Sequence, residues 1–298
     1  FVDFRKIEPK VSRLPVDRWL TNGEKRRRLS QKATEVISVK PPARGLVKIQ
    51  EGCNRFCRYC IVPYVRGRSI SVPANQVLKR VKNLVDKGTS WVVLTGVEVI
   101  DYQDKDLDFL GLVEKILQET EVKLLSFGSI SPLIGKEDSE RLIKIYQKFP
   151  QRVAHHLHLS LQSGSDKILK LMGRGYSALE YKQLAERLKA AIFQLNLTTD
   201  IIVGFPGETE NDFRETLNFL QAVGFGKIHI FRFSPRPGTL ATQKAREWGV
   251  VDEESKRKRL KKLSFLEKKL RLNFWRSLLG MEAQAMFLRE SASTDLYV

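Results

Sequence analysis

Apolar segments that favour β-strands alternate with helical patterns from Leu46 onward, and this alternation constrains the fold more than any other feature of the chain. Six strands are predicted: Leu46–Gln50, Trp91–Thr95, Val122–Ser126, His156–Leu161, Leu195–Val203 and Lys227–Phe233. Strands separated by helices favour a parallel sheet with right-handed crossovers, either open or curved into a partial barrel. We therefore expect the functional residues at the carboxyl ends of the strands.

Three helices are predicted with particular clarity. Apolar residues recur at helical spacing over Val77–Val85, and Gly88 is placed to end that helix. A second helix runs from Glu208 to Gly224, with Thr209 as its expected N-cap. A long basic helix is expected from Glu254 to about Leu279.

The chain divides into a core and two flanking segments. Residues 1–45 are basic and irregular, which predicts a linker or the remnant of a preceding domain. Residues 46–276 form the predicted α/β core, and residues 277–298 resemble the first strand of a further domain. Because the chain begins with Phe1 rather than Met, we expect it to be a fragment.

The charge balance favours a polyanionic partner such as nucleic acid. The chain carries 52 Lys and Arg against 34 Asp and Glu, a formal net charge of +18. No apolar run approaches the roughly 20 residues that span a bilayer, and the N-terminus lacks the apolar stretch of a signal peptide. We therefore expect a cytoplasmic protein with no membrane partner.

The three cysteines lie within eight residues of one another, as Cys53, Cys57 and Cys60. This odd number on one short loop disfavours a disulfide framework and places three soft thiolates around a single inorganic centre. Four cysteines would saturate an iron–sulfur cubane, whereas three leave one iron open to a substrate or cofactor. The spacing therefore favours catalysis over simple electron storage.

Two other interpretations of the cysteines are weaker. A structural zinc site needs a fourth ligand, and no histidine is close in sequence; the remote candidates are His155, His156, His158 and His229. Unliganded cysteines buried as small apolar groups fit poorly, because most of the residues between them are polar or cationic. Those residues include Asn54, Arg55, Arg58 and Tyr59.

The Cys-x3-Cys-x2-Cys loop, with Tyr59 just before its third cysteine, resembles the signature of the radical S-adenosylmethionine (SAM) superfamily. Further segments resemble its methylthiotransferase branch: Lys48–Cys53, Ile61–Ser69, Leu159–Ser165, Thr199–Thr209 and Phe233–Thr239. The resemblance extends from about Lys48 to about Arg276. It implies a partial (βα)6 barrel in which the open iron of a [4Fe–4S] cluster chelates SAM, and reduction yields a 5′-deoxyadenosyl radical.

The resemblance also implies roles for individual residues. Cys53, Cys57 and Cys60 would hold the cluster. The residues expected to contact SAM are Tyr59, Thr95, Gly96, Val97, Ser160, Gln162, Asp200, Val203 and Gly204. The residues expected to contact the substrate or RNA are Arg66, Arg68, Arg174 and Arg236.

Simpler explanations compete for several of these residues. Gly204 suits any strand-to-helix turn, Asp200 could serve its own loop, and the arginines at 66 and 68 could be merely solvated. Ser160 and Gln162 are two residues apart, so a strand would present both on one face. Two positions depart from the family pattern, because Ser126 and Ser131 stand where the family usually has Arg and Glu.

Within the branch, residues 156–160 and 231–239 most resemble enzymes that methylthiolate C2 of threonylcarbamoyladenosine at tRNA position 37. Isopentenyladenosine-37 and a ribosomal-protein aspartate are the alternative substrates of this branch. The family design adds an N-terminal domain with a second [4Fe–4S] cluster and a C-terminal β-barrel (TRAM) domain, of which residues 277–298 would be a truncated start. The expected partners are tRNA and a flavodoxin-like or ferredoxin-like electron donor. A non-catalytic iron–sulfur or RNA-binding module is the alternative outside catalysis.

Overall fold

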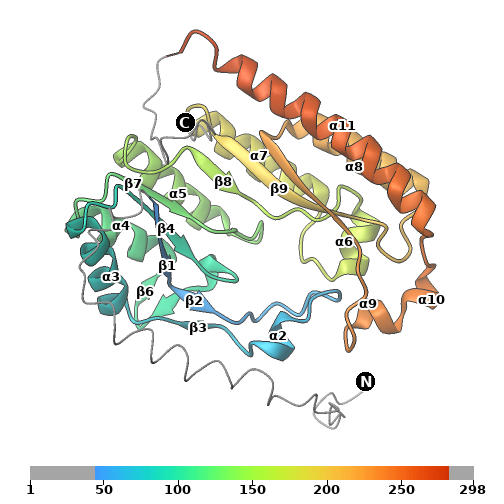
Figure 1. The fold of residues 1–298 in the computed structure, drawn as a ribbon, viewed down its shortest axis with the longest axis horizontal. Helices are drawn as coiled ribbons and strands as arrows, with labels where there is room; N and C mark the ends of the chain where they lie inside the picture. Colours follow the sequence, from blue (N-terminus) through green and yellow to red (C-terminus); the bar gives the residue numbers. More distant parts are fainter. Residues whose placement is uncertain (1–43, 282–298) are drawn as a thin grey trace, which may run out of the picture. The chain divides into compact units, whose positions relative to one another are not determined.

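The computed structural model describes residues 44–281 (Figure 1). Most of the linker expected at residues 1–45, and the further strand expected beyond residue 281, lie outside the described residues; the expected boundary at residue 45 was wrong, because β1 already begins at Arg44. The core expected from residue 46 onward is described up to the end of the long C-terminal helix.

Six parallel strands follow one another in chain order. The first three-stranded sheet contains β1 (Arg44–Lys48), β4 (Trp91–Thr95) and β7 (Leu124–Phe127), and the second contains β8 (His156–His158), β9 (Asn196–Val203) and β10 (Lys227–Arg232). Isolated parallel bridges from Leu125 to Val153 and from Ile130 to Leu159 link the two sheets. The predicted parallel α/β fold is confirmed, and within each of the two sheets the strands lie side by side in chain order.

Five of the six predicted strands differ from the structure at their ends, three of them by two residues or more. Gln50 leaves the parallel sheet and, in β2 (Gln50–Glu51), pairs antiparallel with β3 (Ile70–Ser71). The third strand begins at Leu124 rather than Val122. The fourth ends at His158 rather than Leu161, and Gln162 adopts a φ of +78°, so regular alternation does not place Ser160 and Gln162 on one face.

Helices cover one side of the strands, as Figure 1 shows. The longer helices are α3 (Ala74–Asp86), α4 (Phe109–Glu119), α5 (Lys136–Lys148), α7 (Ala178–Ala191), α8 (Glu210–Val223) and α11 (Glu253–Ser277). The shorter elements are α2 (Val62–Val65), η4 (Val99–Asp101), β5 (Gln103–Asp104), β6 (Leu107–Asp108), α6 (Asp166–Met172), α9 (Leu240–Gln243) and α10 (Ala245–Trp248). Connections between strands thus carry the helices that a right-handed parallel sheet requires.

Local sequence explains where these helices begin and end. Thr209 caps α8 through a capping box with Asp212, as predicted, although the helix begins at Glu210 rather than Glu208. The side chain of Asp252 accepts a hydrogen bond from the amide of Ser255 at the start of α11. Gly88 follows α3 with a φ of +89°, a conformation that glycine adopts without strain.

The core lies between the strands and the helices. In β1, Val47 is fully buried against the helices while Leu46 is 64% exposed on the opposite face. Burying such a side chain stabilises the fold by about 1.5–3 kcal/mol. The buried pair Arg259 and Glu208, with Nη1 to Oε2 at 2.6 Å, ties α11 to the loop after β9. This packing fixes the strand ends, which carry the loops of the candidate site.

Candidate functional site

The three cysteines lie on a loop, residues 52–60, that follows β2; we call it the cysteine loop. All three thiols are free, with Cys53 buried and the other two half-buried. The amide of Cys53 donates to the carbonyl of Gly67 at 3.2 Å, and the amide of Cys60 donates to the carbonyl of Cys57 at 2.9 Å. Backbone hydrogen bonds within the loop and to Gly67 therefore hold the three sulfur ligands on one short segment.

The side chain of Gln50 connects this loop to its surroundings. Its Nε2 donates to the carbonyls of Glu51 and Gly52 at 3.1 and 2.8 Å, and to Ser69 Oγ at 2.8 Å. Its Oε1 accepts from the amides of Val97 and Glu98 at 2.9 and 3.0 Å. One amide side chain, 1% exposed, thus joins the start of the cysteine loop to the end of β4. Sequence reasoning missed this residue.

Two glycines make the close approach feasible. A Cβ on Gly52 would lie 2.0 Å from the carbonyl oxygen of Arg68, and the φ of Gly52 is +73°. A Cβ on Gly96 would lie 2.8 Å from Oε1 of Gln50. Backbone segments meet here at distances that exclude a side chain.

A second contact holds the cysteine loop against η4. Arg55 Nη2 lies 3.0 Å from Asp101 Oδ1, and its Nε lies 3.2 Å from Glu98 Oε2 without the alignment of a hydrogen bond. Burial raises the pKa of Glu98 to about 7 although Arg55 opposes the shift. The amide of Ser131 donates to Glu98 Oε1 at 3.1 Å, so this carboxyl also joins the loop after β7.

Two of the three thiols lie within hydrogen-bond distance of a donor. The guanidinium Nη1 of Arg174 is 3.3 Å from Cys57 Sγ, and the amide of Arg55 is 3.3 Å from Cys53 Sγ. Burial raises the pKa of the Cys53 and Cys60 thiols, so binding of a cation there would release protons. Three soft donors beside a guanidinium fit an anionic iron–sulfur cluster.

The zinc alternative gains no support. Among residues 44–281, no group of three His, Cys, Asp or Glu side chains, the three cysteines included, is arranged to hold a single metal ion, whereas the thiolate ligands of a cubane bind separate irons. The four histidines proposed as remote ligands lie on or beside other strands: the His229 ring packs against that of His158, and the other three bond elsewhere. His156 Nε2 and His158 Nδ1 lie within hydrogen-bond distance of Thr198 Oγ1 at 3.1 and 3.0 Å, and His155 Nε2 lies 2.8 Å from the Pro150 carbonyl.

The predicted SAM-contacting residues at the end of β4 and on the cysteine loop have identifiable partners. Thr95 is half-buried at the end of β4, and its carbonyl accepts from the amide of Ile49 at 2.9 Å. The amide of Val97 is already bonded to Gln50. The ring of Tyr59 packs edge-on against Phe205, with the ring centroids 6.4 Å apart. The side chain of Tyr59 therefore contributes to a small apolar cluster.

The corresponding residues on the second sheet divide into two groups. Ser160 is half-buried beyond β8 with its hydroxyl bonded to Ser129, and Asp200 Oδ2 lies 3.2 Å from His158 Nε2. Val203 is fully buried in the core, so its side chain does not line the site. Gly204 has a φ of +75° and donates its amide to Glu208.

Gln162, buried beyond β8, bridges to β9 through its backbone. Its amide donates to the carbonyl of Asp200 at 2.8 Å, and its carbonyl accepts from the amide of Ile202 at 3.0 Å.

The four predicted substrate arginines do not share one orientation. Arg66, Arg68 and Arg236 are exposed. Helix α9, which begins four residues after Arg236, contacts the cysteine loop, because the amide of Ala241 donates to the carbonyl of Arg58 at 2.8 Å. Arg174 instead faces inward, bonded to Cys57 Sγ, the carbonyl of Ser160 and the hydroxyl of Tyr176.

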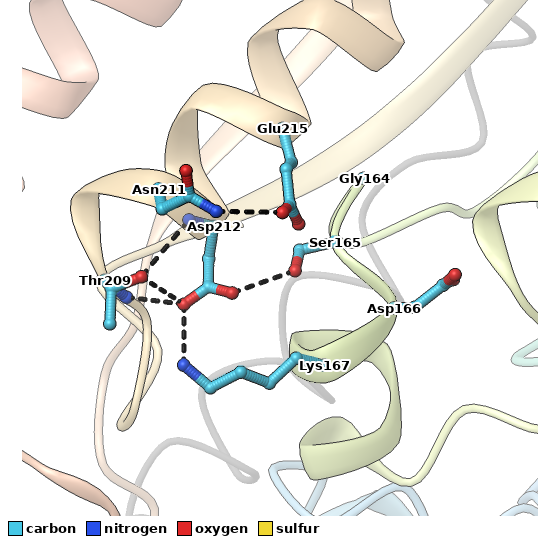
Figure 2. A pocket seen from close by; sticks show the side chains of 8 residues that line it. All are labelled: Gly164, Ser165, Asp166, Lys167, Thr209, Asn211, Asp212 and Glu215. Carbon is cyan, nitrogen blue, oxygen red and sulfur yellow. Dashed lines mark hydrogen bonds and ion pairs between the residues drawn. The ribbon is translucent and has the colours of Figure 1, made fainter.

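A surface cavity of about 660 Å³ lies elsewhere, at the starts of α6 and α8 (Figure 2). The carboxylate of Asp212 at its centre accepts from Ser165 Oγ at 3.0 Å, Lys167 Nζ at 2.8 Å and Thr209 Oγ1 at 2.6 Å. None of the predicted site residues lines this cavity. Its polar groups bond to one another and fix the two helix ends.

No helix among residues 44–281 is long and apolar enough to cross a membrane.

Comparison with known proteins supplies the family. The sequence profile of the Radical SAM superfamily matches residues 47–220. The chain is 36% identical over 285 residues to a tRNA-2-methylthio-N(6)-dimethylallyladenosine synthase from Nitrosomonas eutropha, covering 92% of this chain and 62% of that relative. It is 40% identical over 207 residues to the threonylcarbamoyladenosine tRNA methylthiotransferase MtaB from Chlamydia pneumoniae, covering 70% of this chain and 48% of the relative. The chain thus spans about half to three-fifths of these relatives.

Solved structures agree on the fold. The Escherichia coli coproporphyrinogen III oxidase HemN superposes with a TM-score of 0.57 at 16% identity, covering 78% of this chain and 54% of that one. Methylornithine synthase PylB superposes with a TM-score of 0.53 at 15% identity, covering 85% of this chain and 76% of that one. The chain belongs to the radical SAM superfamily, and its sequence is similar to the tRNA methylthiotransferases within it.

Proposed function

We propose that this chain is the radical-generating part of an enzyme that methylthiolates an adenosine in tRNA. The observation that carries the proposal is the cysteine loop: three free thiols at the carboxyl side of a parallel sheet, two of them facing hydrogen-bond donors. Cys53, Cys57 and Cys60 would hold a [4Fe–4S] cluster with one open iron. Bound there and reduced by one electron, SAM supplies a 5′-deoxyadenosyl radical.

The chain's own residues hold the loop and offset its charge. Gln50 and Gly52 fix the path of the backbone into Cys53, so the first thiol has a defined position. The guanidinium of Arg174 balances negative charge at Cys57, and we therefore assign it to the cluster rather than to RNA. We keep Thr95 and Gly96 as the residues that meet the methionine end of SAM.

The second sheet would frame the nucleoside end of SAM. Ser160 and Asp200 offer polar groups that are only half-buried, and His158 holds the Asp200 carboxylate in one orientation. In this proposal Gln162 and Gly204 act through their backbone, because both adopt positive φ and bond neighbouring segments. We assign Tyr59 and Val203 to packing, since their side chains contact apolar neighbours.

For the substrate, we propose C2 of threonylcarbamoyladenosine at position 37. The resemblance of residues 156–160 and 231–239 supports this choice, and one relative carries that activity in its name. Isopentenyladenosine-37 is the second candidate, because the other relative reported above is named for the dimethylallyl substrate. The test incubates the whole protein with tRNA that lacks the methylthio group. Nucleoside mass spectrometry then shows whether threonylcarbamoyladenosine or isopentenyladenosine has gained it.

The rest of the reaction involves parts beyond this chain. We propose a second [4Fe–4S] cluster in an N-terminal domain and a TRAM domain after residue 276, as in the family design. A flavodoxin-like or ferredoxin-like protein would supply the electron. We place the protein in the cytoplasm with its tRNA substrate. The exposed arginines at 66, 68 and 236 would contact the RNA.

The direct test compares the unsubstituted chain with Cys57→Ala after anaerobic reconstitution. The unsubstituted chain should form 5′-deoxyadenosine from SAM in the presence of dithionite, and Cys57→Ala should form none, because two thiols do not hold the cubane. An intact cluster that leaves SAM uncleaved would instead favour an electron-transfer protein. Salt-sensitive RNA binding without any cluster would favour a non-catalytic RNA-binding module.

A further inference from the structure

Exposed aromatic rings lie beside the cysteine loop. Phe56, between Cys53 and Cys57, is 45% exposed, and Tyr64 in α2 is 58% exposed. Their ring centroids are 5.7 Å apart and the rings meet edge to face. Both rings therefore leave much of their apolar surface in contact with solvent, next to the cysteines.

A guanidinium completes this group. The Cζ of Arg68 lies 4.7 Å from the centroid of the Phe56 ring, and the Arg68 side chain is otherwise exposed. At this distance the positive charge of the guanidinium is attracted to the face of the ring. Residues 61–70 contain two arginines and no carboxylate, while the nearby Glu51 is paired with Lys48 at 2.7 Å.

Planar rings and a stacked guanidinium are the groups on which proteins stack unpaired nucleobases. The excess of positive charge in this segment complements an RNA backbone. We propose that Phe56, Tyr64 and Arg68 form a stacking platform for an unpaired nucleobase next to the base that is modified. This inference rests on the proposed function and adds a base-binding subsite that the predicted arginines alone do not provide.

The test uses an anticodon stem-loop RNA with 2-aminopurine beside position 37 and the reconstituted chain. Binding of the unsubstituted chain should change the fluorescence of the probe. Tyr64→Leu, which keeps apolar bulk but no ring, should weaken binding roughly 5-fold or more and remove that change. Tyr64→Trp, which keeps an aromatic ring, should retain both the RNA affinity and the fluorescence change. Phe193→Leu and Phe265→Leu, at rings 70% and 74% exposed elsewhere, are the matched controls and should bind normally.

Salt dependence separates stacking from charge. Tyr64→Leu should leave the slope of log affinity against log salt unchanged, because it removes no phosphate contact. Arg68→Gln should reduce both the slope and the fluorescence change. Unchanged binding and fluorescence in Tyr64→Leu would overturn the platform.

Two further outcomes identify other failures. Aromatic variants that slow reduction by flavodoxin or ferredoxin, yet bind RNA normally, would assign the surface to an electron donor and overturn the platform. Failure of the unsubstituted chain to bind RNA would contradict the proposed RNA substrate itself.

Discussion

Replacing Gln50 with leucine removes five hydrogen bonds from the joint between the cysteine loop and β4. The substitution leaves the amides of Val97 and Glu98 and the carbonyl of Gly52 without this partner. Each buried polar group left unsatisfied costs about 1–3 kcal/mol, so the three together cost at least about 3 kcal/mol. In a domain of this size, that loss lowers the melting temperature by about 6–12 °C.

The local effect should exceed the global one. Cluster binding is coupled to folding of the segment that carries the ligands, so a released cysteine loop should hold less iron. Gln50→Glu keeps the size and both accepted hydrogen bonds but loses the donors, and we expect an intermediate loss. Gln147→Leu, at an exposed position on α5, is the control and should change stability by less than about 0.5 kcal/mol.

The assay combines thermal unfolding under anaerobic conditions with iron and sulfide analysis after reconstitution. A Gln50→Leu protein with the same melting temperature and iron content as the unsubstituted chain would refute the reasoning. The buried Gln50 amide would then not be needed to position the loop that binds the cluster.

Three further predictions follow from single contacts. Gly52→Ala should destabilise the chain by about 1–3 kcal/mol and reduce iron content, because its Cβ meets the Arg68 carbonyl at 2.0 Å; Gly135→Ala, whose Cβ meets nothing within 4 Å, should not. Thermal unfolding and iron analysis compare the two. Burial lowers the pKa of His156 to about 4 in the folded chain. As the pH drops below about 6.5, His156 is therefore protonated in the unfolded chain but not in the folded one, and the free energy of unfolding falls. Between pH 7 and 5, the free energy of unfolding of His156→Gln in urea titrations should fall by up to about 2 kcal/mol less than that of the unsubstituted chain. An equal fall in both proteins would contradict this assignment. Arg174→Gln should shift the cluster midpoint potential to more negative values in a redox titration, whereas an unchanged potential would separate Arg174 from the cluster.

The sequence predicted the strands well because each is a short apolar run between polar segments. It missed the departure of Gln50 from the first strand because that turn depends on partners far away in the chain, at Ser69 and Val97. It extended the fourth strand too far because Leu159 and Leu161 continue the apolar pattern. In the structure β8 ends at His158; Leu159 forms only an isolated bridge to Ile130, and Leu161 forms none. Alternation alone does not distinguish a strand from an extended loop with similar burial.

The orientation of Arg174 was also beyond local reasoning. Gly173 ends α6 with a φ of +73° and lies against Arg58, whose amide donates to the carbonyl of Met172 at 2.9 Å. This contact turns the chain toward the cysteine loop, so the guanidinium meets Cys57 rather than solvent. The glycine was visible in the sequence, but the segment it packs against was not.

The exposed arginines illustrate the opposite case. Arg66 and Arg68 follow the third cysteine closely, so their position beside the loop follows from the sequence. The stacking of Arg68 on Phe56 does not, because it depends on how the chain returns toward β3.

The central claim is that Cys53, Cys57 and Cys60 hold an open-iron cluster. The most direct measurement is anaerobic reconstitution with iron and sulfide, followed by iron analysis and electron paramagnetic resonance of the reduced chain with and without SAM. We predict about four irons per chain and a spectrum that SAM perturbs, as expected for three cysteine ligands and one open iron. A site that takes up zinc, or a cluster whose spectrum ignores SAM, would contradict the claim.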